Sequence, residues 1–168
     1  MVSLMTHRPN HRAIALFVAV LTFGLDQVSK QWALTTLRPA GSSIMLPGPL
    51  NLTLVFNYSN AFGLAPVSGE LTRWGLAALN LAVAAVLTWV MVRRSMSRLT
   101  AVGLAFLIAG AIGNALDRIR FGAVIDFIDA SKIGFVWVFN VADASVDIGI
   151  GLLLITAILP RRAQVKTG

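Results

Sequence analysis

The chain contains no cysteine and only two histidines among its 168 residues. The missing thiols exclude disulfides, cysteine nucleophiles and metal centres built on cysteine. Both histidines, His7 and His11, lie in a polar N-terminal segment, far along the chain from every acidic residue. A Ser-His-Asp triad or a histidine-ligated metal site is therefore not expected, and we expect no metal and no cofactor.

Charged residues are also scarce, because they make up 12% of the chain while hydrophobic residues make up 57%. A soluble domain carries about 25% charged residues, and a membrane-spanning helix needs about 20 predominantly apolar ones. Four apolar runs meet that requirement. They predict a single membrane-embedded domain over 1–168, with an all-α fold of four transmembrane helices at about 13–34, 74–92, 99–116 and 141–159.

The net charge of +7 raises the question of a nucleic-acid partner, but the basic residues do not form one stripe with interleaved aromatics. They bracket the apolar runs instead, so no nucleic-acid partner is expected. Eight of them fall on one side of the predicted membrane and five on the other, with Lys30 inside the first span. The positive-inside rule then predicts that both termini are cytoplasmic.

The segments between the spans have their own patterns. Residues 39–66 are rich in Pro, Gly, Ser and Asn, and residues 50–54 alternate apolar and polar side chains, which predicts a strand in a small extramembrane β-sheet on the outer side. Within the third span, Gly103, Gly110 and Gly113 favour close helix packing. The apolar stretch 135–139 is expected to contact lipid or to cover a site.

None of the seven acidic residues falls on the predicted cytoplasmic side. Acidic groups in a span are costly and often functional. Asp26 and Lys30 are spaced to form an ion pair on one helical face. That pair either neutralises two charges and fixes the helix or helps to place a substrate. Asn114 and Asp117 lie one turn apart, either as a polar helix end or as part of a site.

Asn140 and Asp143 open the fourth span at a spacing of three, so Asn140 is a candidate cap for that helix. Asp126 lies a short distance before them in the preceding loop. Two carboxylates brought together in a desolvated site cannot both ionise easily, so one keeps a proton. An aspartyl peptidase needs this arrangement, since one carboxylate activates water while the protonated one polarises the scissile carbonyl.

At these residues the chain resembles the bacterial lipoprotein signal peptidases, also called signal peptidase II. The similarity extends over separate blocks along nearly the whole chain. In chain order the blocks are Asp26-Gln27-Val28-Ser29-Lys30, Asn57 with Ala61-Phe62-Gly63, Gly113-Asn114-Ala115-Leu116-Asp117-Arg118, Val124-Ile125-Asp126-Phe127 and Phe139-Asn140-Val141-Ala142-Asp143.

The resemblance implies an aspartic endopeptidase of the bacterial inner membrane, with its active site toward the outer face. It implies that the enzyme cleaves diacylglyceryl-modified prolipoproteins before the lipidated cysteine, with Asp126 and Asp143 as the catalytic dyad. The expected partners are that substrate and membrane lipids, and a monomer is expected. Seven further residues are implied to shape or stabilise the site: Asp26, Lys30, Asn57, Asn114, Asp117, Arg118 and Asn140.

Two features depart from the family pattern. Ser59-Asn60 follow Asn57-Tyr58 where the family has Gly and a small residue, and Asp147 lies one turn beyond Asp143 where an uncharged residue is expected. Asp147 is either a buried carboxylate paired with a neighbouring span or a group that perturbs the dyad. The alternative function is a small ion-coupled transporter that uses intramembrane Asp and Lys, which would place its carboxylates near the membrane midplane.

Overall fold

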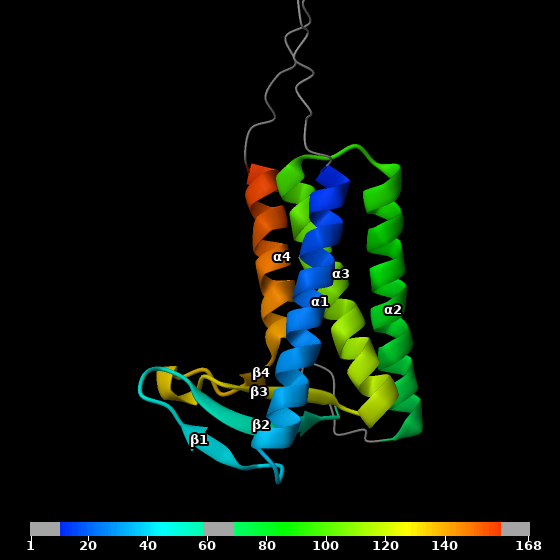
Figure 1. Cartoon of the computed structure of the whole chain (residues 1–168). Coiled ribbons are helices and arrows are strands. Elements are labelled where there is room, and N and C mark those ends of the chain that lie inside the picture. The colour runs from blue at the N-terminus through cyan, green and yellow to red at the C-terminus, as the bar shows by residue number, and fades with distance from the viewer. Residues whose placement is uncertain (1–10, 59–68, 159–168) are drawn as a thin grey trace, which may run out of the picture.

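The computed structural model describes residues 11–58 and 69–158. Four long helices stand side by side and a small sheet lies at one end of the bundle (Figure 1). The helices are α1 (His11–Thr36), α2 (Glu70–Arg93), α3 (Arg98–Phe121) and α4 (Val141–Ile158). All four are long and apolar enough to cross a membrane. The predicted fold class is thereby confirmed.

α3 is the central helix of the bundle. Over its most apolar stretch 56% of the residues are buried, against 11–22% in the other three helices. Its start is set by Ser97, whose Oγ accepts a hydrogen bond from Thr100 N at 3.1 Å, and its end by Gly122 in the left-handed conformation. The helix therefore continues to Phe121, so Asn114, Asp117 and Arg118 lie within its last turns.

Glycines let α3 approach its neighbours closely. A Cβ added at Gly110 would lie 2.6 Å from the carbonyl oxygen of Ala142 in α4, and one at Gly113 would lie 2.5 Å from Asp26 Oδ2 in α1. Gly103 and Gly149 face each other in the same way along the α3–α4 contact. The predicted role of the α3 glycines in close packing is confirmed, and Gly110 and Gly113 lie beside the residues that open α4.

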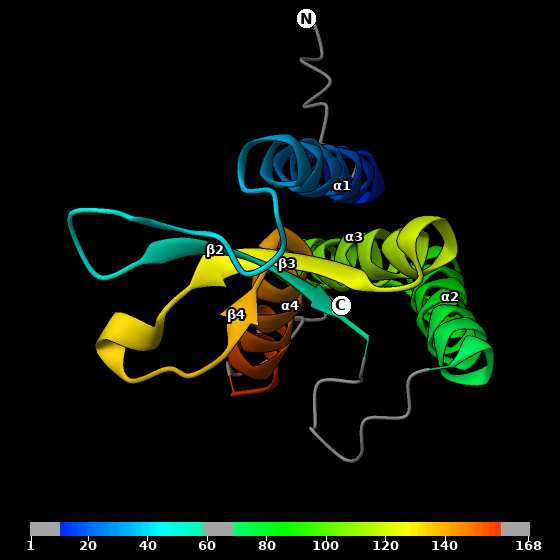
Figure 2. The ribbon, with the colours of Figure 1, turned by 90° about the horizontal axis from the view of Figure 1, so that it is seen from below.

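The sheet has four antiparallel strands in the order β1 (Ser43–Met45), β2 (Asn51–Asn57), β3 (Val124–Asp129) and β4 (Val138–Phe139). The strand predicted from the alternation at residues 50–54 is thus confirmed as part of β2. A short 3₁₀ helix, η1 (Ser131–Ile133), separates β3 from β4. Seen from below, β2 and β3 cross the end of the bundle, and β4 leads directly into α4 (Figure 2).

A small core joins the sheet to α1. It consists of buried side chains from the last turns of α1, from the residue that follows this helix, and from β2 and β3: Ala33, Leu34, Leu37, Leu54, Ile125 and Phe127. This core fixes β3 beneath the bundle. The far end of the sheet projects beyond α4. The apolar stretch 135–139, predicted to contact lipid or cover a site, runs from the end of η1 through β4, and Phe135, Val136 and Trp137 are exposed in it.

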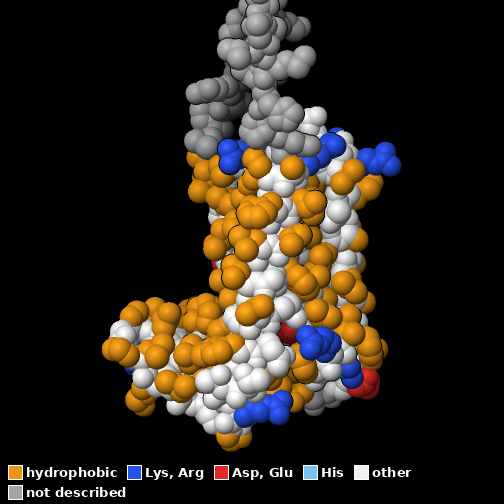
Figure 3. Space-filling view, viewed as in Figure 1, with side chains coloured by type: hydrophobic (Ala, Val, Ile, Leu, Met, Phe, Trp, Pro, Cys, Tyr) orange, Lys and Arg blue, Asp and Glu red, His pale blue; other side chains and the backbone are white. Residues whose placement is uncertain are grey.

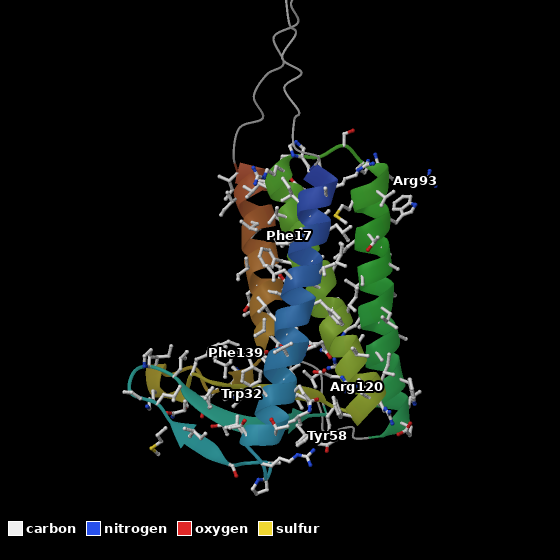
Figure 4. All side chains as sticks on the ribbon, in the orientation of Figure 1. Phe17, Trp32, Tyr58, Arg93, Arg120 and Phe139 are labelled. Carbon is white, nitrogen blue, oxygen red and sulfur yellow. The ribbon has the colours of Figure 1, made fainter. Side chains whose placement is uncertain are left out.

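The surface of the bundle matches a protein that spans a membrane. Hydrophobic side chains cover its sides, and Lys and Arg gather toward its two ends (Figure 3). Arg93 lies at the end opposite the sheet, whereas Trp32, Tyr58 and Phe139 lie at the sheet end (Figure 4). Apolar sides between polar ends are the distribution expected of helices in a bilayer.

Candidate active site

Asp126 lies in β3 where the sheet crosses beneath the helices, and it is only 1% exposed. Both of its carboxylate oxygens accept hydrogen bonds. Asn140 Nδ2 donates to Oδ1 at 2.6 Å, and Asn57 Nδ2 donates to Oδ2 at 3.0 Å. Asn57 reaches Asp126 because β2 pairs with β3 so that Val55 lies opposite Asp126, which makes Asn57 a diagonal neighbour on the same face.

Asp143 lies in the first turn of α4, and Asn140 is the residue before that helix. Asn140 Oδ1 accepts from Asp143 N at 2.9 Å, and the Asn140 N–H donates to Asp143 Oδ2 at 3.3 Å. This reciprocal pair is a capping box, so the predicted cap is confirmed. The same Asn140 side chain donates to Asp126, and therefore one residue holds the two carboxyl groups in a fixed relation.

Asp143 is also held by α3. Asn114 Nδ2 donates to Asp143 Oδ1 at 2.8 Å. The other end of that amide, Asn114 Oδ1, accepts from Lys30 Nζ at 3.0 Å and from Asn140 Nδ2 at 3.3 Å. These two donors orient the Asn114 amide, since its oxygen faces Lys30 and its nitrogen must then face Asp143.

Lys30 is the centre of a buried ionic cluster at the base of the site. Its Nζ lies 2.9 Å from Asp26 Oδ2 and 2.7 Å from Asp117 Oδ2, and all three side chains are at most 2% exposed. Asp26 and Asp117 accept further hydrogen bonds from Ala142 N and Ile125 N, at 2.8 and 3.2 Å. The cluster therefore ties α1 and α3 to the starts of α4 and β3.

The ion pair predicted for Asp26 and Lys30 does form, so both charges are compensated. A further role of this pair in placing a substrate stays a prediction. The same lysine also binds Asn114, which holds Asp143. Asn114 and Asp117 are likewise not an isolated polar helix end, because each contacts this buried network.

Arg118 is 7% exposed and completes the polar end of α3. Its Nη1 donates to Asn114 O at 3.4 Å, and its charge acts on Asp143, Asp126 and Asp117. A cation at this place offsets part of the repulsion among the three carboxyl groups.

All nine residues implied by the resemblance are thus brought together at the sheet end of the bundle.

Burial raises the pKa of Asp126 to about 7, and the nearby charge of Asp143 acts in the same direction. The hydrogen bonds from Asn57 and Asn140 and the charge of Lys30 oppose this rise. Near neutral pH a large share of Asp126 is therefore protonated. One proton on a pair of neighbouring carboxyl groups suits acid–base chemistry.

Asp129 lies three residues after Asp126 but outside this network. Its carboxylate accepts hydrogen bonds from Ser131 N at 2.9 Å and from Thr53 Oγ1 at 2.8 Å, and these bonds lower its pKa. Asp129 therefore stays ionised and holds the turn after β3.

Asp147 is neither buried nor paired with a neighbouring span, so that alternative is wrong. Its side chain is exposed on α4, and among residues 11–58 and 69–158 it forms no hydrogen bond or ion pair. The reason is rotation along the helix: α4 packs on α3 through Ala142, Ser145 and Gly149, and Asp147 points away from that contact.

Two residues near the site were not predicted to belong to it. Gln27 Nε2 donates to Asp26 Oδ2 and Asp117 Oδ1, at 3.0 and 3.3 Å. Its place beside Asp26 was the available signal. Arg73 of α2 donates to the carbonyl oxygens of Arg118 and Ile119 at the end of α3, and no sequence pattern indicated this contact.

Some predictions remain outside the described residues or untested. Ala61-Phe62-Gly63 and Ser59-Asn60 lie in residues 59–68, outside the described ranges. Within 11–58 and 69–158, no three Asp, Glu or His side chains lie close enough to hold a metal ion. The expectation of a reaction without metal or cofactor stays a prediction.

Comparison with known proteins identifies the family. The family model described as signal peptidase (SPase) II matches residues 18–159. The chain belongs to the signal peptidase II family. The resemblance seen in the motif blocks is thereby confirmed, and the chain is a protease rather than a transporter.

Curated relatives of this signal peptidase II chain bear the name lipoprotein signal peptidase. The protein of Caulobacter vibrioides is 45% identical over 155 residues, which cover 91% of both chains. The protein of a Synechococcus strain is 42% identical and covers 82% of this chain and 89% of its own length.

Solved structures show the same architecture. A bacterial membrane enzyme solved at 2.3 Å by the in meso method superposes with a TM-score of 0.75 and 30% identity over 86% of this chain and 87% of that chain. A second, solved at 1.9 Å, gives a TM-score of 0.76 and 28% identity over 89% of this chain and 95% of that one.

Proposed function

We propose that this chain removes the signal peptide from diacylglyceryl-modified prolipoproteins by cleaving before the lipidated cysteine. Membership of the signal peptidase II family supports this substrate class. One structural observation supports the chemistry above all others. Asn140 hydrogen-bonds both Asp126 and Asp143, so a buried carboxyl group from β3 and a half-buried one from α4 face one site.

In this proposal Asp126 is the proton donor, because burial raises its pKa to about 7. Asp143 is the base. It lies in the first turn of α4, where the helix dipole favours a negative charge, and it accepts hydrogen bonds from Asn114 Nδ2 and Asn140 N. The two environments thus separate the roles of the two aspartates.

The reaction then runs in two steps. Asp143 takes a proton from a water molecule whose oxygen attacks the scissile carbonyl carbon, while Asp126 gives its proton to the carbonyl oxygen. The tetrahedral intermediate breaks down when Asp126 recovers that proton and Asp143 passes its own to the amide nitrogen. The C–N bond breaks and both aspartates return to their starting states.

The buried residues around the dyad act on geometry in this proposal. Asn140 fixes the separation of the carboxyl groups, and Asn57 orients Asp126 from the sheet. Lys30 fixes the Asn114 amide, which in turn holds Asp143. Holding the reacting groups before substrate arrives avoids reorganisation during the reaction.

The position of the site favours a peptidase at a membrane surface over the transporter alternative. The dyad lies at the sheet end of the bundle rather than midway along the helices. We place the end of the bundle opposite the sheet in the cytoplasm, because more basic residues are predicted on that side. This puts the site toward the outer face of a bacterial inner membrane. One copy of the chain supplies every residue of the network, which is consistent with a monomer.

The test is a mass measurement. The purified wild-type protein in detergent is incubated with a prolipoprotein that carries the diacylglyceryl group, and with the same protein lacking the lipid. We expect a product whose mass places the cut immediately before the modified cysteine, formed from the lipidated substrate. A cut elsewhere, or no product, would contradict the proposed substrate and cleavage position.

A further inference from the structure

Asp147 is an acidic side chain on the exposed surface of α4, and it belongs neither to the dyad nor to the hydrogen-bonded residues around it. It lies four residues after Asp143, so it is turned by about 40° around the helix axis and displaced by about 6 Å along it. Its side chain is exposed, and within the described residues it has no hydrogen bond or ion pair. An acidic group in a spanning helix is costly when it has no polar partner, so a polar contact from another molecule would stabilise Asp147.

The surface beside Asp147 is open to a neighbouring chain. Gly151 follows one turn later, and a Cβ built there would meet no atom within 4 Å. Gly149 is the opposite case, since its Cβ would lie 2.8 Å from Gly103 O in α3. Asp147 and Gly151 therefore lie on a part of the α4 surface that does not pack on α3, and a small residue on such a surface allows close approach of another backbone.

We identify the molecule that covers the surface around Asp147 from its position beside the dyad, and this step rests on the proposed function. The cleaved bond lies at Asp126 and Asp143, at the sheet end of the bundle. The apolar signal peptide that precedes this bond must run along the helices toward the end opposite the sheet, because its apolar residues lie in the hydrocarbon of the membrane only along that path. Its residues just before the cut thus pass the depth of Asp147.

We propose that Asp147 is a specificity-determining residue that contacts the signal peptide and favours a hydroxyl-bearing side chain there. A displacement of about 6 Å corresponds to about two residues of extended peptide or about four of helix, so the contact lies about two to four residues before the scissile bond. A Ser or Thr hydroxyl donates to the carboxyl group and gives it the polar contact that the bundle does not supply.

The test uses lipidated prolipoproteins that differ only at the second, third or fourth residue before the scissile bond, with Ala or Ser at each. We expect wild-type kcat/KM to favour Ser at one of these positions by about fivefold, the ratio given by one net hydrogen bond of about 1 kcal/mol. The preference should appear mainly in KM, because the contact lies away from the reacting atoms.

Three variants complete the design. Asp147→Leu should bring the Ser-to-Ala ratio to about one, whereas Asp147→Asn, which keeps an acceptor oxygen, should retain most of the preference. Ile148→Ala, exposed on the same helix but turned by about 100°, should leave the ratio unchanged. Leu suits a lipid-facing position, so the informative variant is expected to fold.

The outcomes separate this inference from the proposed function. Absence of any Ser preference in the wild type, or a preference that survives in Asp147→Leu, would overturn the role of Asp147 while cleavage itself stands. Conversion of a dimer to a monomer by Asp147→Leu with the ratio unchanged would overturn it too, by assigning the residue to a contact between copies. Failure of the wild type to cleave any substrate would instead contradict the proposed function.

Discussion

At the scale of single residues, the site depends on three asparagines that each bind a carboxyl group with fixed polarity. Asn57 and Asn140 donate to Asp126, and Asn114 donates to Asp143. An amide has distinct donor and acceptor ends, so each asparagine can recognise the carboxyl oxygen that faces it. Neutral donors hold the aspartates in place without fixing either one permanently in its charged form.

The pKa of Asp126 gives a prediction for the pH dependence of cleavage. Its raised pKa means that the proton needed on the dyad is present below about 7 and is lost as the pH rises through that value. We expect kcat/KM to fall about tenfold for each pH unit above about 7, with an apparent pKa that belongs to the pair. The measurement is the initial cleavage rate at low substrate over that range.

The control for this pH profile is Asp129→Asn. Asp129 has a lowered pKa and lies outside the buried network, so its replacement should leave the alkaline limb in place. A wild-type rate that stays flat from about pH 6 to about pH 9 would show that no group with the pKa of Asp126 governs cleavage.

The sequence predicted which residues form the site, but it predicted few of the contacts between them. The spacing of Asn140 and Asp143 predicted the cap, because capping is local in the chain. The contacts of Lys30 with Asn114 and of Asn114 with Asp143 join separate helices. Which helix faces meet is decided by packing of the whole bundle, and one sequence does not contain that information directly.

At the scale of elements, β3 shows why one strand was predicted and another was not. β2 has a partly exposed face, and its alternation of side chains is visible in the sequence. The first four residues of β3 are all buried, since it crosses beneath the helices, and a strand buried on both faces has no alternation. The hydrogen bond from Arg73 to the end of α3 was not predicted, because no local sequence pattern indicates it.

The close contact of α3 with α4 gives a prediction about stability. Gly110→Ala places a Cβ 2.6 Å from Ala142 O, a backbone atom that cannot move alone. We expect a loss of about 1–3 kcal/mol in the free energy of unfolding, as in other overpacked cores. Cleavage should fall as well, because Ala142 adjoins Asp143. Thermal unfolding in detergent and the cleavage rate measure the two effects.

The matched control is Gly24→Ala in α1, where an added Cβ meets no atom within 4 Å. There the change should be neutral or stabilising by about 0.5–1 kcal/mol, since Ala favours the helix. Equal stability changes at Gly24 and Gly110 would show that the close α3–α4 approach does not limit stability.

At the scale of the whole molecule, contacts from both the bundle and the sheet hold the two aspartates in place. The buried ionic cluster around Lys30 ties α1 and α3 to the starts of β3 and α4, and the α1–sheet core holds β3 from the other side. The membrane-spanning fold thereby presents two carboxyl groups at one end of the bundle.

The basic residues give a prediction about orientation. Arg12, Arg93, Arg94 and Arg98 lie at the end of the bundle opposite the sheet, which we expect to face the cytoplasm. Reporter fusions after Arg94 and Arg162 should give cytoplasmic signals. A fusion after Gly134, in the turn between η1 and β4, should give an external one. A reversed pattern would place the dyad on the cytoplasmic side.

The central claim is that Asp126 and Asp143 together carry out hydrolysis. The most direct test measures cleavage of lipid-modified prolipoprotein by Asp126→Asn, Asp143→Asn, the double variant and Asp129→Asn at equal levels of folded protein. Asn keeps the size of Asp but cannot exchange the proton, so each single variant should lose about 10³-fold or more in rate. The double variant should be no worse than the singles, and Asp129→Asn should stay near wild type. Near wild-type turnover by either dyad variant would contradict the assignment.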